Sequence, residues 1–119
     1  MTPTLQDKQI ALVLKINKSY QRGDIVITDR SNAFKTHMVK RVVAIGGDHL
    51  IIRDQQVYCN GQILAEDYLA EKPQYREELD LVLPPRTVFL MGDNRNYSKD
   101  SRDIGPIPVD SIIGKLIVY

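Results

Sequence analysis

Short runs of β-branched and aromatic residues, separated by turn residues, recur along the whole chain and restrict it to a β-rich fold. Helical periodicity is scarce between these runs. The runs predict strands over residues 9–16, 24–28, 38–45, 49–53, 56–59, 62–64, 87–91 and 112–119. We therefore expect an all-β domain.

Glycine-containing turns predict where the strands reverse. Asn60 and Gly61 separate two of the predicted strands, and both residue types tolerate the positive φ angles of a type I′ hairpin turn. Gly46 and Gly47 allow a similarly sharp reversal after the strand 38–45. The charged stretch 66–85 is expected to hold one short helix or none, and 92–108 to form a long irregular loop.

Length and composition exclude several classes of protein. The 119 residues are enough for one ordinary domain, and 43% hydrophobic with 26% charged residues is typical of a folded one. A formal net charge of +1 provides no long-range attraction for nucleic acid. The longest apolar run, Ile10–Leu14, is far shorter than the ~18 residues of a membrane-spanning helix. A membrane anchor is therefore not expected within this chain.

The cysteine and histidine content argues against a metal centre. Cys59 is the only cysteine, so no disulfide can form within the chain, and His37 and His49 leave too few ligands for a zinc site. Neither histidine has a sequence context that requires a catalytic role. Cys59 is interpreted as a small packed side chain. No metal or cofactor is expected.

Lys40 lies in the middle of an apolar strand. Met38 and Val42 are its neighbours on one face, and Val43 lies on the other. Burial without a carboxylate partner lowers the pKa of a lysine, which then can act as a general base. The alternative is that Lys40 and Arg41 protect an edge strand against aggregation.

The segment 92–105 carries charges that alternate in sign: Asp93, Arg95, Asp100 and Arg102. These residues are able to cross-link a structured loop through charge-assisted hydrogen bonds. Such a loop would hold Ser98 or Ser101 in a fixed place. Taken alone, the segment is better explained as a solvated, turn-rich loop.

In their order along the chain, these segments resemble four sequence blocks of bacterial type I signal peptidases. Residues 1–5 are similar to the end of that family's Ser-Met-x-Pro-Thr-Leu box, and 22–26 resemble the next block. Residues 39–48 resemble the lysine box, with Ala44 and Gly46 where Gly and Pro are usual. Residues 92–105 closely resemble the Gly-Asp-Asn-Arg-x-x-Ser-x-Asp-Ser-Arg-x-x-Gly box.

The resemblance implies a fold and a catalytic arrangement. The fold would be all-β, with twisted antiparallel sheets in one catalytic domain over 1–119 and a reduced second β-subdomain inserted at 49–90. Lys40 would be the general base and Ser98 would orient its amine, supported by an ion pair between Asp100 and Arg102. The positions matching the family's substrate pockets are Met1, Leu5, Met38 and Val39.

The activity implied is that of a serine endopeptidase at the extracytoplasmic face of the cell membrane. It would remove signal peptides from secretory preproteins at small-x-small sites, without a cofactor. The serine that acts as nucleophile in that family would precede Met1, so the 119 residues alone are expected to be inactive. We also expect that the membrane anchor of the parent protein is not part of these residues.

Two alternatives remain. One is a non-catalytic module for peptide binding or pilus assembly that keeps the fold and the groove. The other is a self-cleaving repressor of related Ser/Lys fold. It is the less favoured alternative, because such proteins carry an upstream DNA-binding segment and a cleavage site, and neither is found in these 119 residues.

Overall fold

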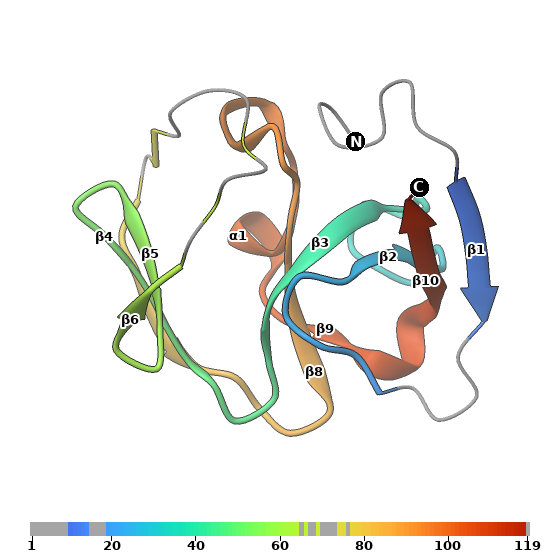
Figure 1. Ribbon diagram of the computed structural model, residues 1–119, viewed down its shortest axis with the longest axis horizontal. Coiled ribbons are helices and arrows are strands. Elements are labelled where there is room, and N and C mark those ends of the chain that lie inside the picture. The colour runs from blue at the N-terminus through green and yellow to red at the C-terminus, as the bar shows by residue number, and fades with distance from the viewer. Residues whose placement is uncertain are drawn as a thin grey trace.

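Two antiparallel β-sheets make up this protein in a computed structural model, which describes residues 10–14, 19–64, 66, 69, 74–75 and 77–118 (Figure 1). The first sheet has six strands in the order β1-β10-β2-β3-β8-β9. Its strands are β1 (Ile10–Leu14), β2 (Ile25–Thr28), β3 (Val39–Ile45), β8 (Thr87–Met91), β9 (Ile107–Pro108) and β10 (Ile112–Val118). The predicted all-β class is therefore confirmed.

The second sheet has four strands in the order β6-β5-β4-β7. They are β4 (His49–Arg53), β5 (Gln56–Cys59), β6 (Gln62–Ile63) and β7 (Leu79–Val82). The predicted hairpin lies between β5 and β6, where Cys59 pairs with Gln62 and the turn residues Asn60 and Gly61 have φ angles of 53° and 84°. All strands of this sheet fall within the range 49–90, whose assignment as an inserted subdomain stays a prediction.

Strands β3 and β8 carry the hydrophobic core because their two faces pack against different clusters. One cluster contains the alternate residues Val42, Val88 and Leu90. The other contains Val43, Ala44, Phe89 and Met91, together with buried residues of the second sheet. The strands β3 and β8 of the first sheet are therefore packed on both faces, one of them against the second sheet, so residues at their ends are held rigidly.

The structure adds elements that the sequence did not predict. The charged stretch 66–85 contributes strand β7, in which Leu79 and Leu81 lie opposite Ile52 and Leu50 of β4. The expected loop at 92–108 contains the 3₁₀ helix η1 (Arg95–Tyr97), the helix α1 (Ser101–Ile104) and β9. A second 3₁₀ helix, η2 (Val109–Ser111), precedes β10.

Several predicted positions lie outside the described residues. These are the ends of two predicted strands, at residues 9, 15–16 and 119, and the substrate-pocket candidates Met1 and Leu5. Within the described residues, no helix is both long enough and apolar enough to cross a membrane.

Candidate active site

Lys40 lies near the beginning of β3, between β2 and the end of β8. It pairs with Val26 of β2 on one side. On the other side, Arg41 pairs with Met91, the last residue of β8. In an antiparallel ladder the next step places Gly92 opposite Lys40. The pairing of two well-packed strands therefore brings the start of the segment 92–105 to the lysine.

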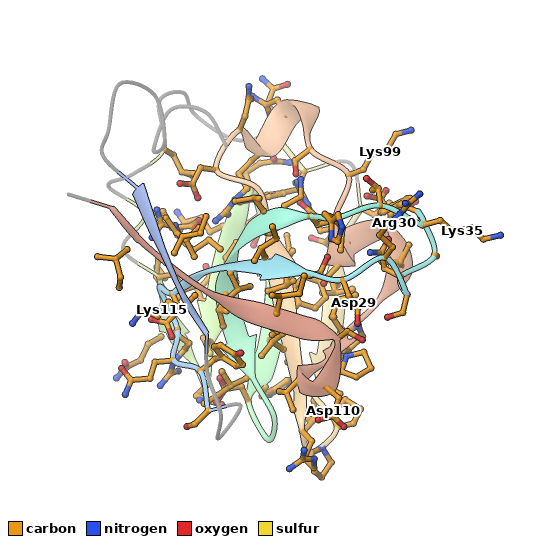
Figure 2. The ribbon with its side chains drawn as sticks, turned by 90° about the vertical axis from the view of Figure 1, so that its right-hand side faces the viewer. Asp29, Arg30, Lys35, Lys99, Asp110 and Lys115 are labelled. Atoms are coloured by element: carbon orange, nitrogen blue, oxygen red, sulfur yellow. The ribbon has the colours of Figure 1, made fainter. Side chains whose placement is uncertain are left out.

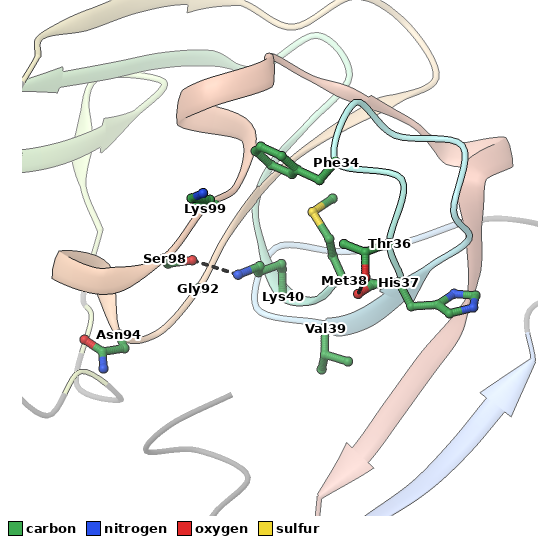
Figure 3. A pocket seen from close by; sticks show the side chains of 10 residues that line it. All are labelled: Phe34, Thr36, His37, Met38, Val39, Lys40, Gly92, Asn94, Ser98 and Lys99. Atoms are coloured by element: carbon green, nitrogen blue, oxygen red, sulfur yellow. Dashed lines mark hydrogen bonds between the residues drawn. The ribbon is translucent and has the colours of Figure 1, made fainter.

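The amine of Lys40 contacts Ser98, as the sequence analysis expected of a lysine and an orienting serine. Lys40 Nζ donates a hydrogen bond to Ser98 Oγ at 2.8 Å (Figure 3). Ser98 Oγ in turn donates to Asp100 Oδ2 at 2.9 Å. Lys40 is half-buried, and no ion pair joins its amine to a carboxylate within the described part of the chain.

Burial lowers the pKa of Lys40 below the ordinary lysine value. The nearby negative charge of Asp100 raises this pKa and the positive charge of Arg102 lowers it, so these two neighbours oppose each other. Loss of hydration favours the neutral amine because a charged ammonium is costly in a poorly solvated place. The site is therefore suited to hold a lysine that accepts a proton.

Asp100 organises the loop around this amine. Its carboxylate accepts hydrogen bonds from Arg102 Nε and Nη2 at 2.9 and 2.8 Å and from the backbone N–H of Gly92 at 3.0 Å. It also caps α1 in a reciprocal capping box with Asp103. Burial alone would raise the pKa of Asp100, but the hydrogen bonds and charge of Arg102 lower it overall. The carboxylate is thus held ionised beneath Ser98.

The alternating charges of 92–105 do not all pair within the segment. Arg102 pairs with Asp100, but Asp93 forms two hydrogen bonds of 2.9 Å with Arg41 of β3. Arg95 pairs with Glu66, at 2.6 Å between Nη2 and Oε2. The loop is therefore attached to β3 through Asp93 and to Glu66 through Arg95, and these charges are paired rather than solvated.

A pocket of about 600 Å³ opens beside the lysine. Its lining residues are Phe34, Thr36, His37, Met38, Val39, Lys40, Gly92, Asn94, Ser98 and Lys99 (Figure 3). The lining includes the predicted substrate-contact residues Met38 and Val39. Among the described residues, it contains basic side chains but no carboxylate. Lys99 and Lys35 point outward at the same end of the molecule (Figure 2).

Sequence reasoning missed part of this pocket wall. Phe34 and Thr36 come from the connection between β2 and β3, where no periodic pattern marks them. Asn94 and Lys99 lie inside the segment 92–105, where the sequence pattern points to the charged residues and the serines only. Gly92 begins the block that resembles signal peptidases, but the sequence alone indicates no role for it.

His49 and Cys59 lie in ordinary structural settings, whereas His37 lines the pocket. His37 contacts the backbone carbonyl of Thr28 through Nδ1 at 2.8 Å, and exposed His49 contacts Asp80 at 2.6 Å in the second sheet. Cys59 is buried and accepts a hydrogen bond from Arg22. No group of three potential metal ligands occurs in the part of the chain that the structure describes.

Comparison with known proteins connects this geometry to a family. A family model described as "Signal peptidase, peptidase S26" matches residues 1–119. The chain is 32% identical to a probable signal peptidase I-2 of Synechocystis, covering 99% of this chain and 57% of the relative. It is 37% identical to signal peptidase I T of Bacillus subtilis, covering 96% of this chain and 65% of the relative.

A solved structure agrees with these sequence relatives. The crystal structure of a signal peptidase I from Enterococcus faecalis superimposes with a TM-score of 0.71 at 30% identity, covering 88% of this chain and 100% of the other. The chain itself spans about 57–63% of the length of several curated relatives that it matches.

Proposed function

Because the chain belongs to the signal peptidase family of S26 peptidases, we propose that it is the catalytic part of a serine endopeptidase that removes signal peptides from secretory preproteins. The observation that carries this proposal is the 2.8 Å hydrogen bond between Lys40 Nζ and Ser98 Oγ beside a pocket. A half-buried amine with a lowered pKa, held by a hydroxyl, has the properties of a general base.

In this mechanism neutral Lys40 accepts the proton of an attacking serine hydroxyl. The serine Oγ–H bond breaks as the new bond from Oγ to the scissile carbonyl carbon forms, giving a tetrahedral intermediate. The intermediate collapses when the carbon–nitrogen bond breaks and the protonated Lys40 amine gives its proton to the leaving nitrogen. Water then attacks the acyl carbon while Lys40 accepts its proton, and the second tetrahedral intermediate collapses as the bond from this carbon to the serine Oγ breaks. The protonated Lys40 amine returns a proton to Oγ, which releases the carboxylic acid product and regenerates the serine.

The other residues of the site would hold these groups in place. Ser98 orients the Lys40 amine, because its hydroxyl proton is donated to Asp100 and its lone pairs face Nζ. The ion pair between Asp100 and Arg102 fixes that carboxylate. Following the resemblance, the attacking serine would be the residue before Met1, which is outside the 119 residues.

The substrate would enter as an extended strand beside β3. Met38 and Val39 line the pocket and, with Met1 and Leu5, are proposed to form the subsites for small side chains at a small-x-small site. The enzyme is proposed to work at the extracytoplasmic face of the cell membrane, through an anchor belonging to the longer protein. Neither a metal nor a cofactor takes part in the proposed steps.

The test is cleavage of a small-x-small signal peptide by three proteins: this chain, the chain extended upstream through a serine before Met1, and the extended chain with Lys40→Ala. We expect cleavage only by the extended chain with Lys40. Cleavage by the unextended chain would require another nucleophile, such as Ser98 or Ser101. An extended chain that stays inactive in lipid and detergent would instead support a non-catalytic peptide-binding module.

A further inference from the structure

Tyr75 joins the second sheet to the segment 92–105, whose Ser98 contacts the proposed catalytic Lys40. Its backbone N–H donates to Gln55 Oε1 at 2.6 Å, and its carbonyl accepts from Gln55 Nε2 at 3.2 Å. Gln55 lies in the tight turn between β4 and β5, where Arg53 and Gln56 pair. The Tyr75 ring also packs against the hydrophobic cluster shared by the two sheets. The residue is therefore anchored at both its backbone and its ring.

The side chain of Tyr75 contacts two arginines of the segment 92–105. Its hydroxyl accepts a hydrogen bond of 3.0 Å from Arg95 Nη1, and its ring lies beneath the guanidinium of Arg102, 5.8 Å from the ring centroid. Buried Arg95 also pairs with Glu66 and donates from Nε to the carbonyl of Gly92 at 2.8 Å. One tyrosine therefore contacts both Arg95 and Arg102, which are not adjacent in the sequence.

Both arginines act on the groups around the lysine. Arg95 holds the Gly92 carbonyl, whereas Arg102 holds the Asp100 carboxylate that receives the Gly92 N–H and the Ser98 hydroxyl. Gly92 is therefore fixed at its carbonyl and at its N–H, directly beside Ser98. A displacement of either arginine would therefore change the position of the Ser98 hydroxyl that contacts Lys40.

From these contacts we infer that Tyr75 is a positioning residue, through which the second sheet sets the geometry and solvation of the Lys40–Ser98 pair. This inference rests on the proposed function for its catalytic consequence. It assigns the second sheet a role in the reaction although its strands lie apart from the pocket.

The experiment compares Tyr75→Phe with Tyr58→Phe in the full-length protein. Tyr58 is a matched control because it lies on β5 with Arg53 over its ring at 5.9 Å, away from the pocket lining. Tyr75→Phe removes the hydrogen bond from Arg95 but keeps the ring beneath Arg102. We expect kcat to fall about threefold to tenfold, the effect of one hydrogen bond, while KM stays within about a factor of two.

The second readout is the titration of Lys40 followed by side-chain ¹⁵N NMR, which needs no activity. Loosening the loop admits water to the amine, so Tyr75→Phe is expected to raise the pKa of Lys40 towards the ordinary lysine value. The low-pH limb of kcat/KM then moves to higher pH by the same amount. Tyr58→Phe is expected to leave both unchanged.

Gln55→Leu provides a variant that leaves the tyrosine intact. It frees the Tyr75 backbone and is expected to shift the Lys40 titration in the same direction. The inference is overturned if Lys40 titrates identically in wild-type, Tyr75→Phe and Gln55→Leu proteins. Absence of cleavage by the wild-type protein would refute the proposed function instead, while the NMR titration would still decide whether Tyr75 positions the pair.

Discussion

Gly92 lies against Ser98 so closely that no side chain fits between them. A Cβ built on Gly92 would lie 2.8 Å from Ser98 Cβ, nearer still to Ser98 Oγ, and 3.4 Å from Lys40 Nζ. The absence of a Cβ thus allows the serine hydroxyl to reach the amine. This glycine is required for its size, since its φ angle is not in the left-handed region.

Gly92→Ala is therefore expected to separate Ser98 from Lys40. Overpacking of this kind costs about 1–3 kcal/mol of unfolding free energy, and the reoriented amine should lower kcat at least about tenfold. Denaturant unfolding and cleavage rates measure the two effects. The double variant Gly92→Ala/Ser98→Gly removes both clashing atoms, Ser98 Oγ and Cβ, and should regain most of the stability but not the activity. An additive double variant would contradict the steric explanation.

Lys40→Met is expected to stabilise the fold while abolishing cleavage. Methionine has a similar shape and no charge to desolvate, and Ser98 keeps Asp100 as its hydrogen-bond partner. The folded-state pKa of Lys40 is lowered, so burying its charged amine reduces the unfolding free energy of the wild type. This loss is full below the folded-state pKa and disappears as pH rises towards ~10.4. Thermal melts at several pH values should show the gain at neutral pH shrinking on the alkaline side. A loss of stability at neutral pH would refute the desolvation argument.

Asp100→Asn is expected to lower stability by about 3 kcal/mol at neutral pH, because Arg102 loses its charged partner in a buried place. Since the pKa of Asp100 is lowered in the fold, its contribution is present above ~3.9 and disappears as pH falls through the folded-state pKa. The difference in unfolding free energy between Asp100→Asn and the wild type should therefore become smaller as the pH falls. Glu77→Gln, on an exposed residue, is the control. Equal melting temperatures for the two variants would make the ion pair unimportant.

Local patterns in the sequence were sufficient for most of the strands, though not for β7 and β9, and for the apolar setting of Lys40. The Asn60-Gly61 turn could be predicted because two positive φ angles are a local requirement that few residue pairs meet. The apolar alternation around Lys40 likewise indicated a lysine with a lowered pKa. The resemblance to signal peptidases is confirmed by the family match.

Long-range contacts account for what the sequence did not predict. Strand β7 follows two glutamates and forms because Leu79 and Leu81 meet β4, a partner that no local pattern reveals. The alternating charges of its own segment predict local ion pairs for Arg95, yet its partners Glu66 and Tyr75 come from the preceding charged stretch. Charges alone do not specify partners that only the folded chain brings together.

The pH dependence of cleavage should follow the ionisation of the same amine. Only neutral Lys40 accepts a proton, so kcat/KM is expected to rise with pH to a plateau, with a midpoint below ~10.4 because burial lowers the pKa of Lys40. Ser98→Ala removes the hydroxyl that holds the amine and should lower the plateau. A rate that is independent of pH over this range would argue against a lysine base.

The most direct test is to measure the pKa of Lys40 by side-chain ¹⁵N NMR in the full-length protein and compare it with the midpoint of kcat/KM against pH. If Lys40 is the general base oriented by Ser98, the two values coincide and lie below ~10.4. If Lys40 titrates at the ordinary lysine value, or if the kinetic midpoint differs from its pKa, another group accepts the proton.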